Sequence, residues 1–293
     1  MSDPYVWWNG SVVRPADARL DPRDRAVLYG IGLFETLRSY DGRPFELPAH
    51  LRRLHATAER LRLDVSMRRA AVGHAIQDLL EACRLTRGDA SVRITVTGGL
   101  DGGGIDRPAA TPPSVLIHAR PTPRHRGIQG IRACRALGDA HRPIPSVKSI
   151  GYLGSALARL AARDRGCDEA IVASPDGSVL EGANSTIFAR IGQVLVTPRL
   201  DGRILPSVTR RIVLEIARSV GIATEQRSIA WEELVSAREV LSVGSVREIA
   251  AVVAIDERPI GTGSPGPFGR RLFREYRRRT LRTLGGSAVQ PRS

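Results

Sequence analysis

The sequence predicts an α+β protein in which β-hairpins and helices follow one another irregularly. Two observations support this prediction. Short apolar and β-branched runs are separated by turn residues, as at 5–7 and 11–13 on either side of the Asn9-Gly10 turn. Longer segments place apolar residues three or four positions apart, which is the spacing of an amphipathic helix. The sequence pattern lacks the regular strand–helix–strand alternation of a dinucleotide-binding fold.

The first part of the chain is predicted to form a small α/β domain at residues 1–119. Leu47, Leu51, Leu54, Ala58 and Leu61 are spaced by four and three residues, which predicts a helix. The remaining elements expected in this part are strands at 5–7, 11–13, 33–39, 92–97 and 115–119 and a helix at 67–85. A Pro- and Arg-rich segment, 120–130, is predicted to be the interdomain loop.

A larger domain is predicted at 131–284, followed by a polar tail at 285–293 that we expect to be disordered. Its first helix, at 151–165, places Leu153, Leu157 and Leu160 on one face. The other expected elements are strands at 170–173, 178–180, 185–189, 194–196 and 240–243, a helix at 207–220 and a final Arg-rich helix.

Composition excludes several classes of protein. The chain has 293 residues, of which 42% are hydrophobic, and this is enough for a substantial core. No run of about 18 apolar residues predicts a membrane helix, and the first residues do not resemble a signal peptide. The three cysteines, Cys83, Cys134 and Cys167, have no metal-type spacing. We therefore expect reduced thiols, no metal site and a cytoplasmic location.

The formal net charge of +14 raises the question of nucleic-acid binding. The arginines are spread along the chain, and no basic run alternates with aromatic residues as a base-stacking surface requires. We therefore expect no nucleic-acid partner. For the dense cluster on the final helix, we favour a solvated helix surface, and polyanion binding is the alternative. The cluster comprises Arg270, Arg271, Arg274, Arg277, Arg278, Arg279 and Arg282.

Lys148 is the only lysine among the 44 basic residues that are Lys or Arg. Where a positive charge alone is needed, this sequence uses arginine, so a retained lysine indicates a need for an amine. A guanidinium stays protonated at ordinary pH and cannot form an imine, whereas an amine can. Lys148 lies where an extended segment meets a helix, at 146–153. An ordinary surface lysine is the alternative interpretation of this residue.

Residues after Lys148 supply the other groups that pyridoxal phosphate requires. Glu181 ends a predicted strand and could pair with a protonated pyridine nitrogen, although a carboxylate there could also be simply exposed. A helix begins at Ser207, and its free N–H groups suit a phosphate as well as ordinary capping. Gly244 and Ser245 follow a buried strand and offer a backbone donor and a hydroxyl.

The order of these motifs resembles the class IV aminotransferases, which are pyridoxal-phosphate enzymes of fold type IV. This family includes branched-chain aminotransferases, D-amino acid aminotransferases and aminodeoxychorismate lyases. The resemblance implies a small N-terminal α/β domain, a larger cofactor-binding domain built as a pseudo-barrel, and a homodimer. It runs from about residue 7 to 276 through the segments 24–38, 50–54, 148–153, 168–170, 181–188, 204–211 and 243–249.

The resemblance also implies roles for individual residues. Lys148 would carry the cofactor as a Schiff base and shuttle a proton, Glu181 would meet the pyridine nitrogen, and Tyr152 would reach the phenolic oxygen. The remaining implied cofactor residues, mainly around the phosphate, are Arg53, Ser185, Val208, Thr209, Gly244 and Ser245. The periodicity alone places Arg53 on the predicted helix at 47–61 as a solvated residue.

Arg93 matches an arginine that recognises carboxylates in many branched-chain enzymes, although it could equally be an outward residue on a half-buried strand. The implied substrate residues are Tyr29, Phe34, Arg38, Arg93 and Val246. We expect transfer of an amino group between a branched-chain-like or other apolar amino acid and a 2-oxo acid such as 2-oxoglutarate.

Three alternatives remain open at this point. Segments 29–38 and 197–201, with Thr36, also resemble aminodeoxychorismate lyases, which release pyruvate and 4-aminobenzoate. A D-amino acid aminotransferase is the second alternative, although the loop 98–108 contains no histidine of the kind those enzymes use. The third is a basic binding protein on a degenerate scaffold. Thr186 departs from the asparagine that is usual in the family.

Overall fold

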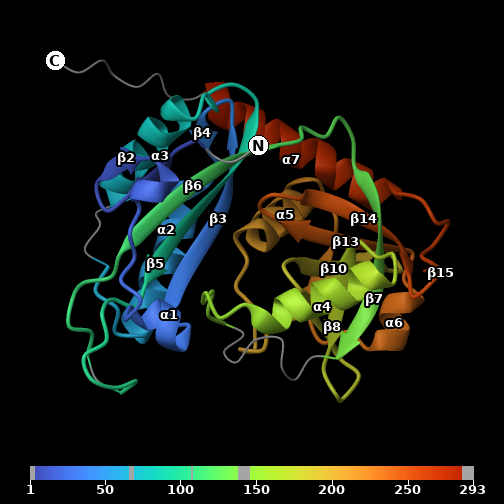
Figure 1. The fold of residues 1–293 in the computed structure, drawn as a ribbon. Helices are drawn as coiled ribbons and strands as arrows, with labels where there is room; N and C mark the ends of the chain where they lie inside the picture. The colour runs from blue at the N-terminus through green and yellow to red at the C-terminus, as the bar shows by residue number, and fades with distance from the viewer. Residues whose placement is uncertain (1–3, 66–68, 107, 138–145, 286–293) are drawn as a thin grey trace. The chain divides into compact units, whose positions relative to one another are not determined.

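A computed structural model describes residues 4–65, 69–106, 108–137 and 146–285 of the chain. The chain divides into two compact units, which are coloured along the chain in Figure 1. The first unit comprises Met1–Arg124, Val147–Gly151 and Thr280–Ser293, and the second comprises His125–Ser146 and Tyr152–Arg279. The tail that we predicted to be disordered lies outside the described residues, apart from Gly285.

The first unit is built on a six-stranded sheet with the order β2-β1-β6-β5-β3-β4. Neighbouring strands pair antiparallel, and the register places Thr36 opposite Arg93 and Phe34 opposite Thr95. Phe34 and Arg93 therefore lie on the same face of the sheet. The strands are β1 (Val6–Trp8), β2 (Ser11–Val13), β3 (Gly32–Tyr40), β4 (Arg43–Pro44), β5 (Asp89–Thr97) and β6 (Val115–Thr122).

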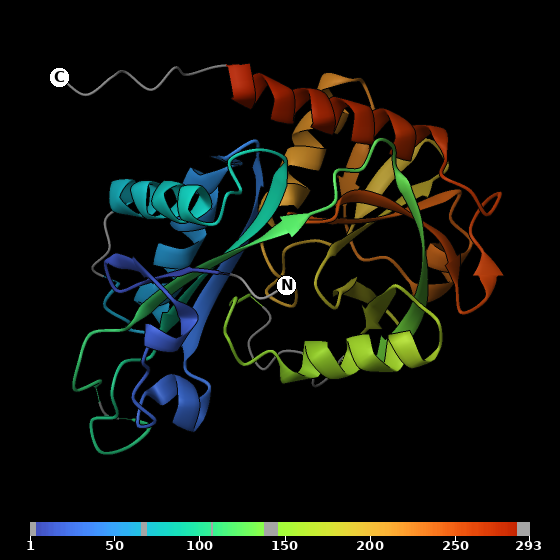
Figure 2. The same cartoon turned by 45° about the horizontal axis from the view of Figure 1, so that its top comes forward.

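Two helices, α2 (Leu47–Arg60) and α3 (Arg69–Ala82), cover one face of this sheet (Figures 1 and 2). The apolar residues whose spacing predicted α2 are buried or half-buried, and Leu51 and Leu54 join the core. Ile76 and Leu79 of α3 are fully buried in the same core, opposite apolar residues of β3, β5 and β6. A single turn of 3-10 helix (Pro15–Asp17) and the short helix α1 (Arg25–Tyr29) precede β3.

The second unit is built on a nine-stranded sheet with the order β12-β11-β10-β13-β14-β7-β8-β9, and β15 pairs with β14. Its apolar interior includes residues of several strands together with Trp231 and Leu234. Figure 2 shows the sheet curling around that interior. The strands are β7 (Gln129–Leu137), β8 (Glu169–Ala173), β9 (Val179–Gly182), β10 (Thr186–Ile191), β11 (Val194–Thr197), β12 (Thr224–Gln226), β13 (Glu239–Gly244), β14 (Glu248–Ile255) and β15 (Arg258–Pro259).

The helices of the second unit are α4 (Leu153–Asp164), α5 (Val208–Ser219), α6 (Trp231–Val235) and α7 (Pro267–Gly285), the last of which ends in the first unit. α4 differs from the expectation raised by its leucine spacing. Leu153, Leu157 and Leu160 are 71%, 56% and 55% exposed, and the residues that α4 buries are Ser155 and Ala162. The apolar stripe of α4 therefore faces away from the core of the chain.

The segment 120–130, which we predicted to be the interdomain loop, contains the boundary between the two units, at Arg124 and His125, but strands occupy both of its ends. β6 continues to Thr122, and β7 begins at Gln129. β7 pairs in parallel with both β8 and β14, so the segment feeds directly into the larger sheet. Arginine and proline are more typical of loops than of strands, so the sequence of 120–130 did not predict the two strand ends. Among the described residues, no helix is both long and apolar enough to cross a membrane.

Candidate functional site

The segment that carries Lys148 pairs with the beginning of β3. The Phe34 N–H donates a hydrogen bond to the Lys148 carbonyl oxygen at 3.0 Å, and the Ile150 N–H donates to the Gly32 carbonyl oxygen at 3.0 Å. These two bonds form a short antiparallel ladder, as between neighbouring strands of a sheet. The backbone of Lys148 is therefore held by the sheet of the first unit, although the residue lies 108 positions after Tyr40, the end of β3.

Gly32 makes this close approach possible. A Cβ atom on Gly32 would lie 2.7 Å from Cδ1 of Ile150 and 2.7 Å from the carbonyl oxygen of Val96. Both distances are shorter than any ordinary carbon contact, and the Val96 oxygen belongs to the backbone of β5. A side chain at position 32 would therefore clash with the backbone of β5, and the side chain of Ile150 would also have to move.

The amine of Lys148 lies against an aromatic ring. Its Nζ is 4.3 Å from the centroid of the Phe34 ring, and the Arg93 Cζ is 3.6 Å from the same centroid. Each distance is within the range of a cation–π interaction. The side chains of Lys148 and Arg93 are both half-buried. The structure thus brings together three of the predicted site residues: an amine, an aromatic ring and a guanidinium.

Arg53 lies on the helix-covered side of β3, beside Glu35. Its Nε donates to Glu35 Oε1 at 2.7 Å and its Nη2 donates to Glu35 Oε2 at 2.7 Å, which is a two-pronged ion pair. His50 Nδ1 is 2.8 Å from Glu35 Oε2. Glu35 and His50 are fully buried, and Arg53 keeps 13% of its side chain exposed. Our expectation that Arg53 is a solvated residue of this helix was therefore wrong.

Burial and charge set the protonation states of this cluster. Burial opposes the ionisation of Glu35, but the charge and hydrogen bonds of Arg53, with the hydrogen bond of His50, lower the pKa of Glu35 to about 2. Burial lowers the pKa of His50 below its usual 6.5, and this effect exceeds the opposing influence of Glu35. At neutral pH, Glu35 is therefore ionised and His50 is neutral. The Nδ1–H of the neutral His50 then donates to the Glu35 carboxylate.

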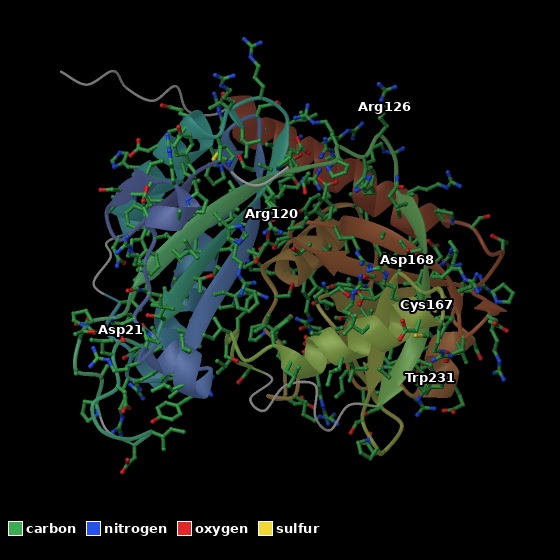
Figure 3. The ribbon with its side chains drawn as sticks, in the orientation of Figure 1. Asp21, Arg120, Arg126, Cys167, Asp168 and Trp231 are labelled. Atoms are coloured by element: carbon green, nitrogen blue, oxygen red, sulfur yellow. The ribbon has the colours of Figure 1, made fainter. Side chains whose placement is uncertain are left out.

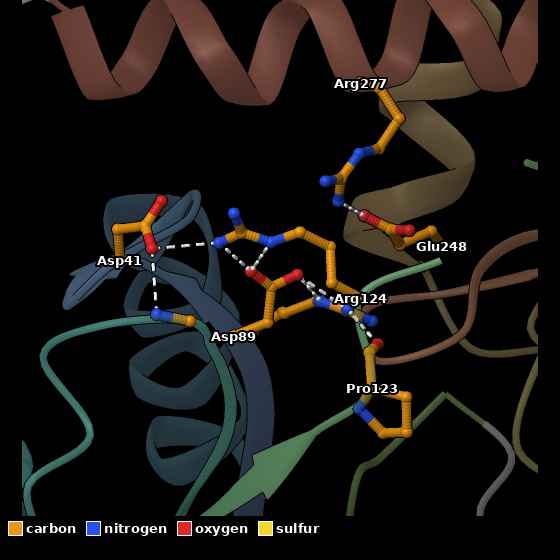
Figure 4. Close-up of polar contacts among 8 residues, drawn as sticks. Asp41, Asp89, Pro123, Arg124, Glu248 and Arg277 are labelled. Carbon is orange, nitrogen blue, oxygen red and sulfur yellow. Dashed lines mark hydrogen bonds and ion pairs between the residues drawn. The ribbon is translucent and has the colours of Figure 1, made fainter. Parts of the chain in front are cut away.

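Arg38 is held elsewhere in the first unit. Its Nε and Nη2 donate to Asp89 Oδ2 at 3.1 Å and 2.7 Å, and Nη2 also donates to the Pro123 carbonyl oxygen at 2.6 Å. Arg124 joins the same aspartate and Asp41, as Figure 4 shows. Arg38 is 1% exposed, so its guanidinium is committed to a structural ion pair. This placement argues against the substrate-binding role that we expected for Arg38.

In the second unit, the first turn of α5 presents hydroxyl groups and free N–H groups. Ser207 caps the helix, because its Oγ accepts a hydrogen bond from the Arg210 N–H at 3.2 Å. Thr209 Oγ1 lies 3.5 Å from Ser245 Oγ, which follows β13. The start of a 12-residue helix carries partial positive charge, so this pair of hydroxyls lies where an anion is favoured. Val208 is buried at the same turn.

Glu181 lies on β9 and is 2% exposed. Its Oε2 accepts a hydrogen bond from the Leu205 N–H at 3.2 Å, and that residue precedes α5. The Tyr152 hydroxyl donates to the Ala183 carbonyl oxygen at 3.3 Å, two residues beyond Glu181. The exposed carboxylate that sequence alone allowed at position 181 is therefore excluded. A buried acid beside a helix start suits a cationic ring nitrogen.

Ser185, which we expected among the cofactor residues, lies in a hydrogen-bond network between strands. Its Oγ donates to Glu169 Oε2 at 2.9 Å and accepts a hydrogen bond from Ser242 Oγ at 2.9 Å. Gly182 packs against this pair, since a Cβ atom there would lie 3.3 Å from Glu169 Cδ. The network connects Ser185 to β8 and β13 close to the end of β9, where Glu181 lies.

The remaining predicted residues lie at the surface or in turns. Gly244, the last residue of β13, is half-buried, as are Ser245 and Val246 in the turn that follows. Tyr29, the last residue of α1, is 39% exposed. Sequence reasoning missed the role of Glu35, although a signal was present. A glutamate between Leu33 and Leu37 occupies a core-facing position of β3, where a charge requires a partner.

The donor set fits pyridoxal phosphate. Lys148 offers an amine, Glu181 a buried carboxylate for a ring nitrogen, Thr209 and Ser245 hydroxyls for a phosphate, and Tyr152 a phenol. Each of these groups is positioned by backbone hydrogen bonds or by the packing of a strand or helix end.

Comparison with known proteins identifies the family. The family model of class IV amino-transferases matches residues 32–255. A putative branched-chain-amino-acid aminotransferase of Methanocaldococcus jannaschii is 32% identical and covers 97% of this chain and 98% of its own length. An aminodeoxychorismate lyase of Bacillus subtilis is 31% identical and covers 88% of this chain and 89% of its own length.

The fold also matches. The crystal structure of a branched-chain aminotransferase from Thermoproteus uzoniensis with norvaline superposes with a TM-score of 0.85 at 31% identity and covers 94% of each chain. This match confirms the predicted fold class of fold-type IV enzymes. The chain belongs to the class IV aminotransferases and is a pyridoxal-phosphate-dependent transaminase.

Proposed function

We propose that this transaminase moves an amino group between an amino acid with a branched-chain or other apolar side chain and a 2-oxo acid such as 2-oxoglutarate. The proposal rests chiefly on the contact of the Lys148 amine and the Arg93 guanidinium with one ring, that of Phe34. An amine suits covalent chemistry, and a guanidinium suits the binding of a carboxylate. The similarity to branched-chain aminotransferases supports the apolar side chain of the substrate.

Pyridoxal phosphate, when bound, supplies a ring that accepts electrons from the bond broken at the substrate α-carbon. Glu181 would keep the ring nitrogen protonated, because a buried carboxylate stabilises a neighbouring cation. The Leu205 N–H orients that carboxylate. The Tyr152 hydroxyl would donate to the phenolic oxygen of the cofactor.

The phosphate would be held by hydroxyls and by positive charge. Thr209 and Ser245 contribute hydroxyl groups at the start of α5, where Val208 is the first residue of the helix. Arg53 would contribute its guanidinium, the direction of which is set by the two-pronged pair with Glu35. An arginine that is already oriented loses less side-chain entropy when it binds.

Lys148 would both hold the cofactor and move the proton. Its Nζ would be bonded covalently to the cofactor in the resting enzyme and would be freed when the substrate amine replaces it. Once released, Nζ would take and hold the α-proton of the substrate, which is the acid–base step that amino transfer requires. Phe34 beside this amine excludes water and provides an apolar wall for the substrate side chain. Arg93 would bind the substrate carboxylate through charged hydrogen bonds.

An absorbance spectrum tests the role of Lys148. Protein reconstituted with pyridoxal phosphate should show an absorbance band at the border of the ultraviolet and visible ranges. Borohydride reduction should attach the cofactor permanently to the peptide that contains Lys148, which mass spectrometry detects as an added mass. Lys148→Ala should lose both signals, whereas Tyr152→Phe, which keeps the amine, should retain them. Near-visible absorbance in Lys148→Ala equal to that of the wild type would refute the assignment.

A panel of L- and D-amino acids tests the substrate. In the half-reaction with each amino acid, branched-chain L-amino acids should convert the cofactor to its amine form faster than charged ones do. Subsequent 2-oxoglutarate should restore the original spectrum. If D-alanine reacts faster than every L-amino acid, the chain is a D-amino acid aminotransferase and the proposed substrate class is wrong.

Aminodeoxychorismate lyase activity is a second candidate. It is favoured by the similarity to the lyase of Bacillus subtilis over 88% of this chain and by the segments 29–38 and 197–201. Release of pyruvate from aminodeoxychorismate, with the cofactor spectrum unchanged by branched-chain amino acids, would replace the transaminase proposal. Our proposal requires the reverse result.

We also propose that the enzyme is a homodimer, as its family resemblance implies. The exposed leucines of α4 support an interface with a second copy, because three exposed leucines at helical spacing form an apolar stripe on one helix. Contiguous apolar surface of this kind is typical of association sites.

A further inference from the structure

Two oppositely charged residues, Arg247 in the turn between β13 and β14 and Glu248 at the start of β14, each pair with a different element. Arg247 Nη1 lies 3.2 Å from Glu169 Oε2 at the start of β8, and Arg247 Nη2 donates to the Asp168 carbonyl oxygen at 3.2 Å. Glu248 Oε1 accepts a hydrogen bond from Arg277 Nη1 of α7 at 2.7 Å, a contact drawn in Figure 4. Figure 3 labels Asp168 beside Cys167.

Both ion pairs involve a fully buried carboxylate. The side chains of Glu169 and Glu248 are 0% exposed, whereas Arg247 and Arg277 are 24% and 18% exposed. Loss of Arg247 would remove one of the two arginines that compensate the buried charge of Glu169, the other being Arg159. Glu248 also has a φ of +64°, a left-handed conformation that a residue with a side chain adopts only when its surroundings impose it.

Further hydrogen bonds connect Glu169 to β13, the strand that precedes the turn. Glu169 Oε2 accepts from Ser185 Oγ at 2.9 Å, and Ser242 Oγ of β13 donates to Ser185 Oγ at 2.9 Å. Arg247 Nη1 is also 3.4 Å from Ser242 Oγ. The side chain of Arg247 therefore folds back over the strand that enters the turn, and Ser245 lies between the residues that this network holds.

We propose that Arg247 is a positioning residue that fixes the β13–β14 turn so that Ser245 faces the cofactor phosphate together with Thr209. The inference rests on the proposed function, which assigns the phosphate to these two hydroxyls. Arg247 acts through the backbone of the turn and through Glu169. Its effect should therefore appear in recognition of the phosphate group and not in the chemistry at Lys148.

The chain offers a matched control in Arg159 of α4. Arg159 Nη1 lies 3.5 Å from Glu169 Oε1 and also donates a hydrogen bond to the Asp168 carbonyl oxygen. Arg159 and Arg247 thus carry the same charge and contact the same carboxylate and the same carbonyl group. Only Arg247 belongs to the turn, so a difference between their variants reports on the turn itself.

The experiment compares Arg247→Met with Arg159→Met by using two probes, pyridoxal phosphate and pyridoxal. Both probes react with the same amine, so the ratio of their dissociation constants isolates the contribution of the phosphate. We expect Arg247→Met to lower the preference for pyridoxal phosphate about tenfold, the effect of losing roughly one charged hydrogen bond. Arg159→Met should leave the ratio within about twofold of the wild type, and Arg247→Lys should restore part of it.

Hydrogen exchange gives a second measurement that does not require the cofactor. In cofactor-free protein, Arg247→Met should accelerate exchange of the backbone amides at 245–248, and Arg159→Met should not. Equal probe ratios and equal exchange in the two variants would overturn the inference. This result is distinguishable from failure of the proposed function, in which Ser245→Ala and Thr209→Val would leave the probe ratio unchanged.

Discussion

At the scale of single residues, Glu35 shows how a charge is kept in the core of the first unit. The two-pronged pair with Arg53 and the hydrogen bond from His50 surround its carboxylate with donors. The spacing of leucines along α2 identifies which residues of the helix are apolar. It does not say that Arg53 and His50 face a buried acid on a neighbouring strand, so the resemblance alone indicated a role for Arg53.

Because burial lowers the pKa of His50 below 6.5, this histidine should make stability depend on pH. Below pH 6.5 the unfolded chain takes up a proton at position 50 that the folded chain resists, so stability falls as pH falls. The fall should continue until the lowered pKa of the folded state is reached. Its slope can be at most about 1.4 kcal/mol per pH unit for one proton.

His50→Asn should remove this contribution, because asparagine retains an N–H donor for Glu35 but does not titrate. The free energy of unfolding, measured by urea titration between pH 7 and pH 5, should fall less steeply for the variant than for the wild type. His74→Asn, a change of the same kind at an exposed residue of α3, is the control with which the slope of His50→Asn is compared. Parallel profiles for the wild type and His50→Asn would contradict the prediction.

At the scale of secondary-structure elements, periodicity predicted most helices and strands but not what they contact. α2 and α4 show leucines at similar spacing, yet α2 buries its apolar face under β3 whereas α4 exposes Leu153, Leu157 and Leu160. A pattern of three and four residues shows that a face is apolar. Whether that face meets the core of the same chain or another surface depends on topology, which the pattern does not contain.

If the exposed stripe of α4 meets a second copy of the chain, Leu157→Asn should weaken the dimer. Loss of one buried leucine contact costs roughly 1.5–3 kcal/mol, which raises the dissociation constant by about tenfold or more. Sedimentation at several protein concentrations measures this change directly. Leu281→Asn on α7, where the leucine is 57% exposed, is the matched control and should sediment like the wild type. A wild-type protein that remains monomeric at all concentrations would disprove the interface.

At the scale of the whole molecule, the net charge of +14 determines how strongly the protein attracts polyanions. Many arginines are neutralised locally, as Arg277 is by Glu248 and Arg279 by Glu215. The remaining positive charge should attract polyanions through counterion release, without recognition of a sequence.

We therefore expect DNA of any sequence to bind weakly at low salt and to dissociate as the salt concentration approaches about 0.15 M. A filter-binding or fluorescence-anisotropy titration at several salt concentrations measures this binding. Transamination should proceed at the same rate with and without DNA at the higher salt concentration. Binding that prefers one sequence and survives high salt would instead indicate a dedicated nucleic-acid site.

The sequence predicted the kinds of groups at the candidate site better than their arrangement. Lys148 was identified by its chemical difference from arginine, and Thr209 by its place at a helix start. Arg247 gave no signal, because a single arginine in a turn is indistinguishable from a solvated one until Glu169 is seen beside it. We expected Arg38 to bind substrate for the same reason. Its partner Asp89 lies 51 residues away in sequence, so the sequence does not show their ion pair.

A chain with one lysine has a practical property that follows from the position of that residue. Amine-directed reagents, such as activated esters used to attach dyes or to couple enzymes to resins, have Lys148 as their only side-chain target. Coupling through this position would inactivate the enzyme if Lys148 holds the cofactor. Pyridoxal phosphate bound there would protect it. Labelling in the presence of the cofactor should therefore direct the reagent to the N-terminal amine. In its absence, the amount of label on Lys148 would measure the number of accessible active sites.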